Sequence, residues 1–374
     1  MSRLSDFVNS NVRVMNGYAP GEQFNDPEII KLNTNENPFP ATRAVLDALS
    51  EEIEKNRLHL YPNPASQQLR QAIAEKFNRS ERCVLIGNGS DDILSIVFRT
   101  FLNHENKFII PWPTYSLYPV LSDIAGTSFK KIPLKENWHL DFKAMNAAAA
   151  EISHNAEVMT IFANPNAPTG VFEKPEDVLS YCEKNSGLTL VDEAYIAFGG
   201  ESVMPAAGSD EYPRLMACGT FSKSHSLAGQ RIGWIVAHED LIYEMDKVRD
   251  SYNLSRLAQV AGLAAVQDDH EYNKRFEIII ENRKFISTEL KKRGFTFPES
   301  YANFIFVKPP EVSVKTDDTA RDYYEFLKKN KILIRYFPGE VTGSHVRITV
   351  GRKEQLEKLI EITDLFLAEH PVAR

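Results

Sequence analysis

Short apolar runs alternate with helix-period segments through the middle of the chain, beginning near residue 83. The runs predict strands at 83–86, 107–110, 158–163, 188–191, 215–217 and 232–236. Amphipathic stretches between them, such as 91–102, predict helices that bury one face. Nearly continuous apolar strands separated by helices are typical of a mostly parallel sheet covered by helices on both faces. The predicted fold class is therefore α/β.

The pattern changes towards both ends of the chain. Helices are predicted at 41–55, 66–77, 252–267, 271–293, 319–330 and 353–368, and further strands at 303–307, 332–336 and 345–350. Residues 1–40 are rich in turn-forming Asn and Pro. Because 374 residues are too many for one compact core, we expect an N-terminal arm (1–40), a large domain (41–270) and a small α+β domain (271–374).

Composition narrows the classes of function. A net charge of −8 and the lack of a basic run argue against a nucleic-acid partner. Three widely spaced cysteines predict neither a disulfide framework nor a metal site, which fits a reducing cytoplasm. Nine scattered histidines lack metal-ligand spacing, so we expect no metal. No apolar stretch predicts a signal peptide or a membrane span.

The chemistry concentrates where the predicted strands end. Lys223 follows the strand at 215–217, between small hydroxyl residues, with Arg231 nearby. A lysine at the end of a strand suits a Schiff base to an aldehyde cofactor, and Ser222 and Arg231 suit its phosphate. An ordinary solvated lysine in a surface loop is an equal alternative on this stretch alone. However, Asn164 and Asp192 end neighbouring strands, where ligands of parallel sheets bind.

These groups can be interpreted as parts of a pyridoxal phosphate site. Asp192 would face the ring nitrogen, Asn164 and Tyr195 would donate to the phenolate oxygen, and Tyr115 would cover the ring. Each has a plain structural alternative: a helix-capping aspartate, a turn asparagine or a half-buried tyrosine. Their convergence favours the cofactor.

The turn Gly87-Asn88-Gly89-Ser90-Asp91 joins a strand to a helix and predicts a phosphate site at the start of the helix. It also looks like the beginning of a dinucleotide fingerprint. Asp92 stands where that fingerprint requires its third glycine, so we discount the alternative.

Arg335 and Arg347 lie in neighbouring strand-like runs. They could be edge or snorkelling residues, or could together recognise a carboxylate or phosphate of a substrate.

Several motifs follow one another in order along nearly the whole chain. They are Gly17-Tyr18-x-Pro20-Gly21, Asn35-Glu36-Asn37-Pro38, Tyr61-Pro62, Gly87-Asn88-Gly89-Ser90-Asp91, Pro113-Thr114-Tyr115, Asn164-Pro165-Asn166-x-Pro168-Thr169-Gly170, Val191-Asp192-Glu193-Ala194-Tyr195, Ser222-Lys223-x-x-x-Leu227-Ala228-Gly229-x-Arg231 and Arg347-Ile348-Thr349. On these motifs the chain resembles the fold-type I pyridoxal-phosphate aminotransferases, and among them is most similar to the histidinol-phosphate aminotransferases. One departure is Ala167, where many relatives carry a second Asn.

The resemblance implies roles for individual residues. Lys223 would hold the cofactor and shuttle the proton, with Asp192 on the pyridinium nitrogen. Further cofactor contacts would come from Ser90, Asp91, Tyr115, Asn164, Tyr195, Ser222, Arg231 and, from a second subunit, Tyr61. Substrate contacts would come from Tyr18, Asn164, Arg335 and Arg347. The implied assembly is a cytoplasmic homodimer to which the N-terminal arm contributes.

The implied reaction is amino transfer between L-histidinol phosphate and 2-oxoglutarate, which yields glutamate, in histidine biosynthesis. Threonine-phosphate-type decarboxylases and other phospho-amine or aromatic aminotransferases share the lysine and aspartate motifs and stay open as alternatives. A transcription regulator with an aminotransferase-like domain is disfavoured, because the motifs begin at Gly17 and leave no room for a DNA-binding module.

Overall fold

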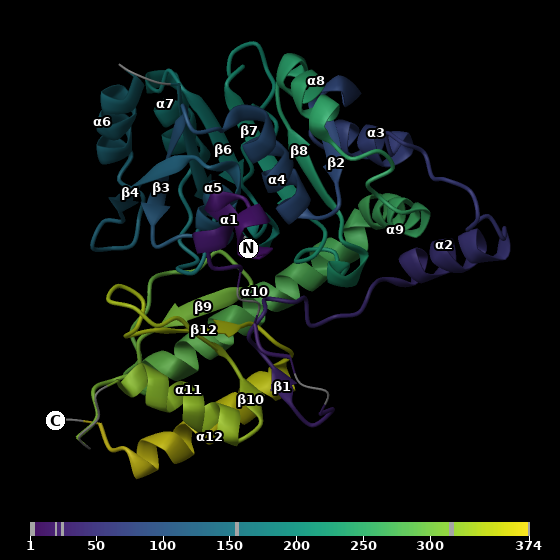
Figure 1. The fold of residues 1–374 in the computed structure, drawn as a ribbon. Coiled ribbons are helices and arrows are strands. Elements are labelled where there is room, and N and C mark those ends of the chain that lie inside the picture. Colours follow the sequence, from purple (N-terminus) through teal and green to yellow (C-terminus); the bar gives the residue numbers. More distant parts are fainter. Residues whose placement is uncertain (1–3, 19–20, 24–25, 154–156, 314–317, 373–374) are drawn as a thin grey trace.

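The computed structural model describes residues 4–18, 21–23, 26–153, 157–313 and 318–372. Its larger part is a seven-stranded sheet between helices (Figure 1). The strands are β2 (Val84–Gly87), β3 (Lys107–Trp112), β4 (Ser128–Pro133), β5 (Val158–Ala163), β6 (Leu188–Asp192), β7 (Leu215–Thr220) and β8 (Gly233–Val236). Their order is β2-β8-β7-β6-β5-β3-β4; β8 runs antiparallel to both neighbours, and the other adjacent pairs are parallel.

Side chains of the central strands alternate between two buried faces. On one face, Met159, Ile161 and Met216 pack with α4 (Ser90–Phe101), α5 (Leu117–Ala125) and α8 (Glu239–Val248). On the other face, Phe162 and Val191 belong to a larger core that includes α6 (Phe142–Ser153) and α7 (Pro175–Lys184). Because both faces are covered, each central strand is a nearly continuous apolar run. The predicted α/β class is confirmed.

The predicted strands lacked β4. It is an edge strand with mostly exposed or half-buried residues, and Lys130 and Lys131 interrupt its apolar pattern. The helices α2 (Arg43–Glu54), α3 (Gln67–Lys76) and α9 (Arg256–Gln267) pack together beside β2. The long helix α10 (Asp269–Lys292) then runs from this region to the C-terminal part of the chain (Figure 1).

The C-terminal part contains two small sheets. The antiparallel sheet has the order β11 (Arg335–Tyr336), β12 (Val346–Thr349), β9 (Phe304–Val307). The other pairs β10 (Ile332–Leu333) with β1 (Ile30–Lys31) of the N-terminal arm. Helices α11 (Thr319–Lys329) and α12 (Lys353–Glu369) cover them. The strand expected at 332–336 is therefore split between two sheets, because the arm supplies a partner for its first half. The expected domain boundaries stay a prediction.

The N-terminal arm also carries the short helix α1 (Ser10–Val14), which lies against α5. Within the described residues, no helix is long and apolar enough to cross a membrane.

Candidate active site

Three adjacent parallel strands bring the predicted polar residues to one edge of the sheet. Ala163 is the register partner of Asp192, and Asp192 of Cys218, so β5, β6 and β7 end side by side. The backbone N–H of Asn164 donates to the Asp192 carbonyl at 2.9 Å. Lys223 lies in the loop after β7, three residues beyond its last residue Thr220. The structure thus places Asn164, Asp192 and Lys223 at neighbouring strand ends.

The Lys223 amine is held in a largely enclosed position. Its Nζ donates to the Thr34 carbonyl at 3.0 Å, and the Asn37 amide donates to the backbone carbonyl of Lys223 at 3.2 Å. Burial, together with the positive charge of Arg347, lowers the pKa of Lys223 to about 8, and Glu36 partly opposes this shift. An amine with this pKa is partly neutral near pH 7, which makes it a usable nucleophile and proton acceptor.

Asp192 is a buried carboxylate, 4% exposed. It accepts hydrogen bonds from the Tyr118 hydroxyl and the Ala194 backbone N–H, both at 3.1 Å. Burial raises the pKa of Asp192 to about 6. No cationic side chain of the described residues forms an ion pair with it. A buried acid without a cation fits a site that receives a cationic ligand atom.

A cradle for an anion forms at the start of α4. The Gly89 backbone has φ 94°, and a Cβ at Gly233 would come within 2.5 Å of the Ser90 nitrogen, so only glycine allows β8 to approach this closely. Arg231 lies beside this turn, 3.2 Å from the Asp91 carboxylate, and its Nη1 donates to the Ser222 hydroxyl at 3.4 Å. Helix-start N–H groups, a hydroxyl and a guanidinium are donors that suit a phosphate.

Tyr115 connects this cradle to Asp192. Its hydroxyl donates to Asp91 at 3.1 Å, and its ring makes edge contacts with Tyr118 (5.6 Å between centroids) and Tyr18 (6.2 Å). Burial and the nearby Asp91 charge raise the pKa of Tyr115, so the phenol stays neutral. Tyr118 was missed in the sequence; its position in an amphipathic helix gives no sign of its contact with Asp192.

The Asn164 side chain bonds the backbone of Glu173, and its expected contact with the cofactor stays a prediction. Its Nδ2 donates to the Glu173 carbonyl at 2.9 Å, and its Oδ1 accepts from the Glu173 N–H at 2.8 Å. Both ends of the amide thus stabilise the turn after β5, and the second Nδ2 proton is not used by these two bonds. Ala167, at the departure from the motif, has no polar side-chain atom. The Tyr195 hydroxyl, by contrast, lies at the site and accepts from Asn35 Nδ2 at 3.0 Å.

Arg335 and Arg347 are register partners on antiparallel strands, so their side chains share one face. Both guanidinium groups lie over the Phe337 ring, at 5.5 and 5.3 Å. Arg347 donates to the Asn33 carbonyl at 2.9 Å, while its Nε has no hydrogen-bond partner among the described residues. Like charges facing each other across a ladder repel, which favours an anion between or beside them.

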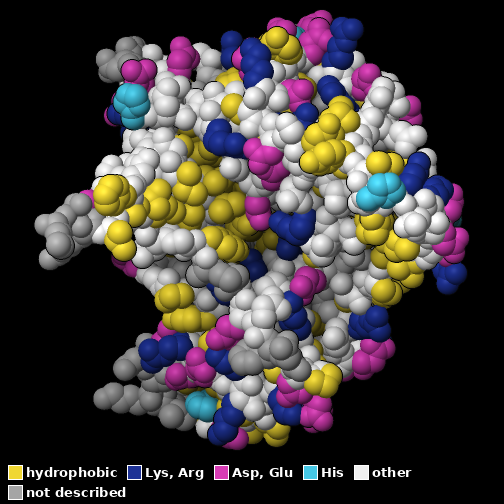
Figure 2. Space-filling model, turned by 45° about the vertical axis from the view of Figure 1, so that its right-hand side comes forward, with side chains coloured by type: hydrophobic (Ala, Val, Ile, Leu, Met, Phe, Trp, Pro, Cys, Tyr) yellow, Lys and Arg dark blue, Asp and Glu magenta, His cyan; other side chains and the backbone are white. Residues whose placement is uncertain are grey.

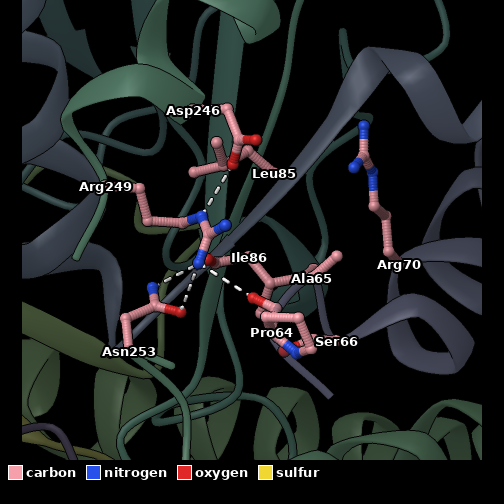
Figure 3. Close-up of a pocket in the computed structure, with 9 residues that line it drawn as sticks. All are labelled: Pro64, Ala65, Ser66, Arg70, Leu85, Ile86, Asp246, Arg249 and Asn253. Atoms are coloured by element: carbon pink, nitrogen blue, oxygen red, sulfur yellow. Dashed lines mark hydrogen bonds and ion pairs between the residues drawn. The ribbon is translucent and has the colours of Figure 1, made fainter. Parts of the chain in front are cut away.

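Tyr61 is not brought to these residues. It lies in the loop between α2 and α3, 77% exposed, and stacks on Tyr252 at 4.4 Å. Two arginine side chains bind the backbone of this loop. Arg256 donates to the Tyr61 carbonyl at 2.8 Å, and Arg249 donates to the Pro64 carbonyl at 2.9 Å. Figure 3 shows Arg249 at the centre of a small pocket there, between Asp246 and Pro64.

Comparison with known proteins was made on sequence and on structure. Residues 27–362 match the family model "Aminotransferase class I and II". A histidinol-phosphate aminotransferase of Syntrophus aciditrophicus is 38% identical over 361 residues, 95% of this chain and 96% of the relative. The structure of the Sinorhizobium meliloti histidinol-phosphate aminotransferase in complex with pyridoxal-5'-phosphate has a TM-score of 0.84 at 22% identity, covering 96% and 98% of the two chains. That of L-threonine-O-3-phosphate decarboxylase from Porphyromonas gingivalis has a TM-score of 0.77 at 21% identity, covering 91% and 100%.

Proposed function

Because the chain belongs to the class I and II aminotransferase family, we propose that it is a pyridoxal-phosphate enzyme that transfers an amino group between L-histidinol phosphate and 2-oxoglutarate, in histidine biosynthesis. The observation that carries the proposal is the placing of a lysine of lowered pKa and a buried carboxylate at the ends of adjacent parallel strands. Near-complete coverage of curated histidinol-phosphate aminotransferases supports the substrate.

The residues at the sheet edge fit the cofactor. Asp192 offers a negative charge for a ring nitrogen, and Lys223 a partly neutral amine for an aldehyde. Ser90, Ser222 and Arg231 offer donors for a phosphate. When bound, pyridoxal phosphate supplies the electron sink for the bond broken at the substrate Cα.

Other residues of the site would work around this arrangement. Asp91 is itself an anion, so beyond its backbone N–H at the helix start it would act by orienting Arg231 and Tyr115. Tyr115 would cover the ring. Lys223 Nζ, with a pKa of about 8, would accept the proton from the substrate Cα and deliver it again. The Tyr195 hydroxyl would donate to the ring oxygen.

Substrate recognition would fall to Arg335, Arg347 and Tyr18, which lie on the C-terminal sheet and the N-terminal arm. Both proposed substrates are anions, one through its phosphate and the other through its carboxylates, so one pair of guanidinium groups can serve them in turn. If so, unphosphorylated histidinol should be a far weaker donor. Equal activity on histidinol and its phosphate ester would contradict the assignment.

A phospho-amino-acid decarboxylase is the second candidate, because the Porphyromonas gingivalis decarboxylase shares the fold. Two incubations separate the candidates. L-Histidinol phosphate with 2-oxoglutarate should yield glutamate, whereas L-threonine O-3-phosphate should release no carbon dioxide. The reverse pattern would establish the decarboxylase.

For the assembly we propose a homodimer in which Tyr61 reaches the partner's phosphate cradle. The Tyr61 side chain is exposed on a loop whose backbone is held by arginine side chains.

Several apolar side chains of the N-terminal arm are exposed: Leu4, Phe7, Val8, Val12 and Val14. Figure 2 shows hydrophobic side chains gathered on one face of the molecule. Such a patch is typical of a protein interface. Light scattering should give twice the mass of the chain; a monomer at micromolar concentration would refute the shared site.

For location we propose the cytoplasm. Cys83 and Cys218 are buried free thiols, and Cys182 is also free. Free thiols persist in a reducing compartment.

A further inference from the structure

Asn35 lies at the point where the N-terminal arm crosses the candidate active site. It is 1% exposed, and its backbone is left-handed with φ 56°. Non-glycine residues adopt this conformation rarely, and asparagine is among the few that tolerate it. Contacts to two separate segments hold it: its N–H donates to Thr349 Oγ1 at 3.0 Å, and its carbonyl accepts from Asn303 Nδ2 at 2.9 Å. The backbone is therefore fixed from both sides.

The same contacts fix which way the Asn35 amide points. Thr349 Oγ1 accepts the Asn35 N–H, so its own proton is available to donate to Asn35 Oδ1, 3.0 Å away. With Oδ1 facing Thr349, the amide can present only its NH₂ group to Tyr195, whose hydroxyl oxygen lies 3.0 Å from Nδ2. If the Asn35 amide were flipped, it would lose the hydrogen bond from Thr349. Its Oδ1 would then face the Tyr195 hydroxyl, which would have to donate to it.

This arrangement determines the direction of the Tyr195 hydroxyl. Because Asn35 donates to its oxygen, the phenol proton has to point elsewhere. The charged and titratable groups that act on Tyr195 are Arg347, Asp192 and Tyr18, and burial raises the pKa of Tyr195, so the phenol remains a donor. Phe304 packs edge-on against its ring at 4.9 Å and limits its movement.

We propose that Asn35 is a positioning residue that orients Tyr195 as a one-way hydrogen-bond donor to the ring oxygen of the cofactor. The inference rests on the proposed function and adds a residue of the N-terminal arm to the cofactor machinery. Tyr195 matters more in this chain because Ala167 carries no donor at the position where many relatives have a second Asn.

The test uses the absorbance of the bound cofactor as a function of pH, which reports the proton on its chromophore. Asn35→Gly keeps the left-handed backbone and removes the amide. A donor stabilises the deprotonated ring oxygen, so its loss should raise the apparent pKa of the absorbance change by about one unit. Asn78→Gly is the matched control: this asparagine has φ 53° and is exposed, and its variant should titrate like the wild type.

A double-mutant comparison separates positioning from a general structural effect. In a Tyr195→Phe background, Asn35→Gly should add no further shift, because the hydroxyl that Asn35 orients is gone. An equal shift in both backgrounds, or no shift in a variant that still binds the cofactor, overturns the inference. If Asn35→Gly does not fold, Thr349→Val and Thr349→Ser decide. Val removes the hydroxyl that orients the amide and should raise the apparent pKa, whereas Ser keeps it and should not; identical titrations would overturn the inference.

Failure of the proposed function would look different. If the cofactor assignment failed, the wild-type protein would not bind pyridoxal phosphate, and no pH-dependent absorbance would exist to compare. If only the substrate assignment failed, the incubations with L-histidinol phosphate and L-threonine O-3-phosphate would show it, and this titration would still test Asn35.

Discussion

The buried amine of Lys223 should make the stability of the cofactor-free protein depend on pH. Burial lowers the pKa of this lysine from 10.5 to about 8. The perturbation is Lys223→Met, which keeps an unbranched side chain of similar length and removes the titrating group. Comparing this variant with the wild type cancels the other ionisable groups, since they titrate in both.

The sign follows from proton binding. Between pH 8 and 10.5 the folded lysine is neutral while the unfolded lysine is still protonated, so the unfolded state binds more protons and stability rises with pH. At about 1.4 kcal/mol per pH unit, the gain across this window is at most about 3 kcal/mol. Below pH 8 the wild type carries the full cost of a buried cation, so Lys223→Met should be the more stable protein there.

The assay is urea unfolding of both cofactor-free proteins between pH 7 and pH 10. The advantage of Lys223→Met should be largest at pH 7 and shrink by roughly 1 kcal/mol for each pH unit above 8. A difference that does not change with pH, or one that grows as pH rises, would refute the account of Lys223 as a buried amine.

Other predictions concern activity. Asp192→Asn should lower kcat/KM at least a hundredfold, about 3 kcal/mol, because it removes a buried charge. Tyr115→Phe loses one hydrogen bond to Asp91 and should lower kcat/KM about tenfold or less. Equal losses of kcat/KM in the two variants, measured by steady-state kinetics, would count against the roles given. Arg347→Met should raise KM for L-histidinol phosphate more than tenfold and leave KM for unphosphorylated histidinol nearly unchanged, so parallel changes would argue against anion recognition. Mixing inactive Lys223→Met subunits with weakened Tyr61→Phe subunits should give hybrid dimers in which one site combines the intact Lys223 of one subunit with the intact Tyr61 of the other. Activity of the mixture no higher than that of Tyr61→Phe alone would exclude a shared site.

The sequence predicted the sheet well because its central strands are buried on both faces. Nearly continuous apolar runs such as Val158–Ala163 can be recognised as buried strands without knowing their tertiary contacts. The edge strand Ser128–Pro133 was not predicted because most of its residues are exposed or half-buried, and its lysines interrupt the apolar pattern that would indicate a strand. The split of 332–336 depends on Ile30–Lys31, a partner about 300 residues away, which local pattern cannot reveal.

The candidate site was predictable to the extent that it lies at strand ends. Asp192 and Lys223 follow apolar runs, and adjacent parallel strands must bring such residues together. Which side chains of the site contact one another could not be predicted from the sequence. The Asn164 amide bonds the backbone of Glu173, and Asn35 contacts Tyr195 from a left-handed backbone conformation. Neither contact produces a periodic pattern in the sequence. The motif Asn35-Glu36-Asn37-Pro38 marked this segment without indicating what it touches.

The most direct test of the account is to reduce the cofactor-loaded protein with borohydride and to map the modified peptide by mass spectrometry. Reduction makes the link between cofactor and lysine permanent, so the added mass identifies the residue. The account predicts the pyridoxyl phosphate mass on Lys223, at the end of β7, and its absence from a Lys223→Met variant treated in the same way. The same mass on a different lysine of the wild-type protein, or none at all, would contradict it.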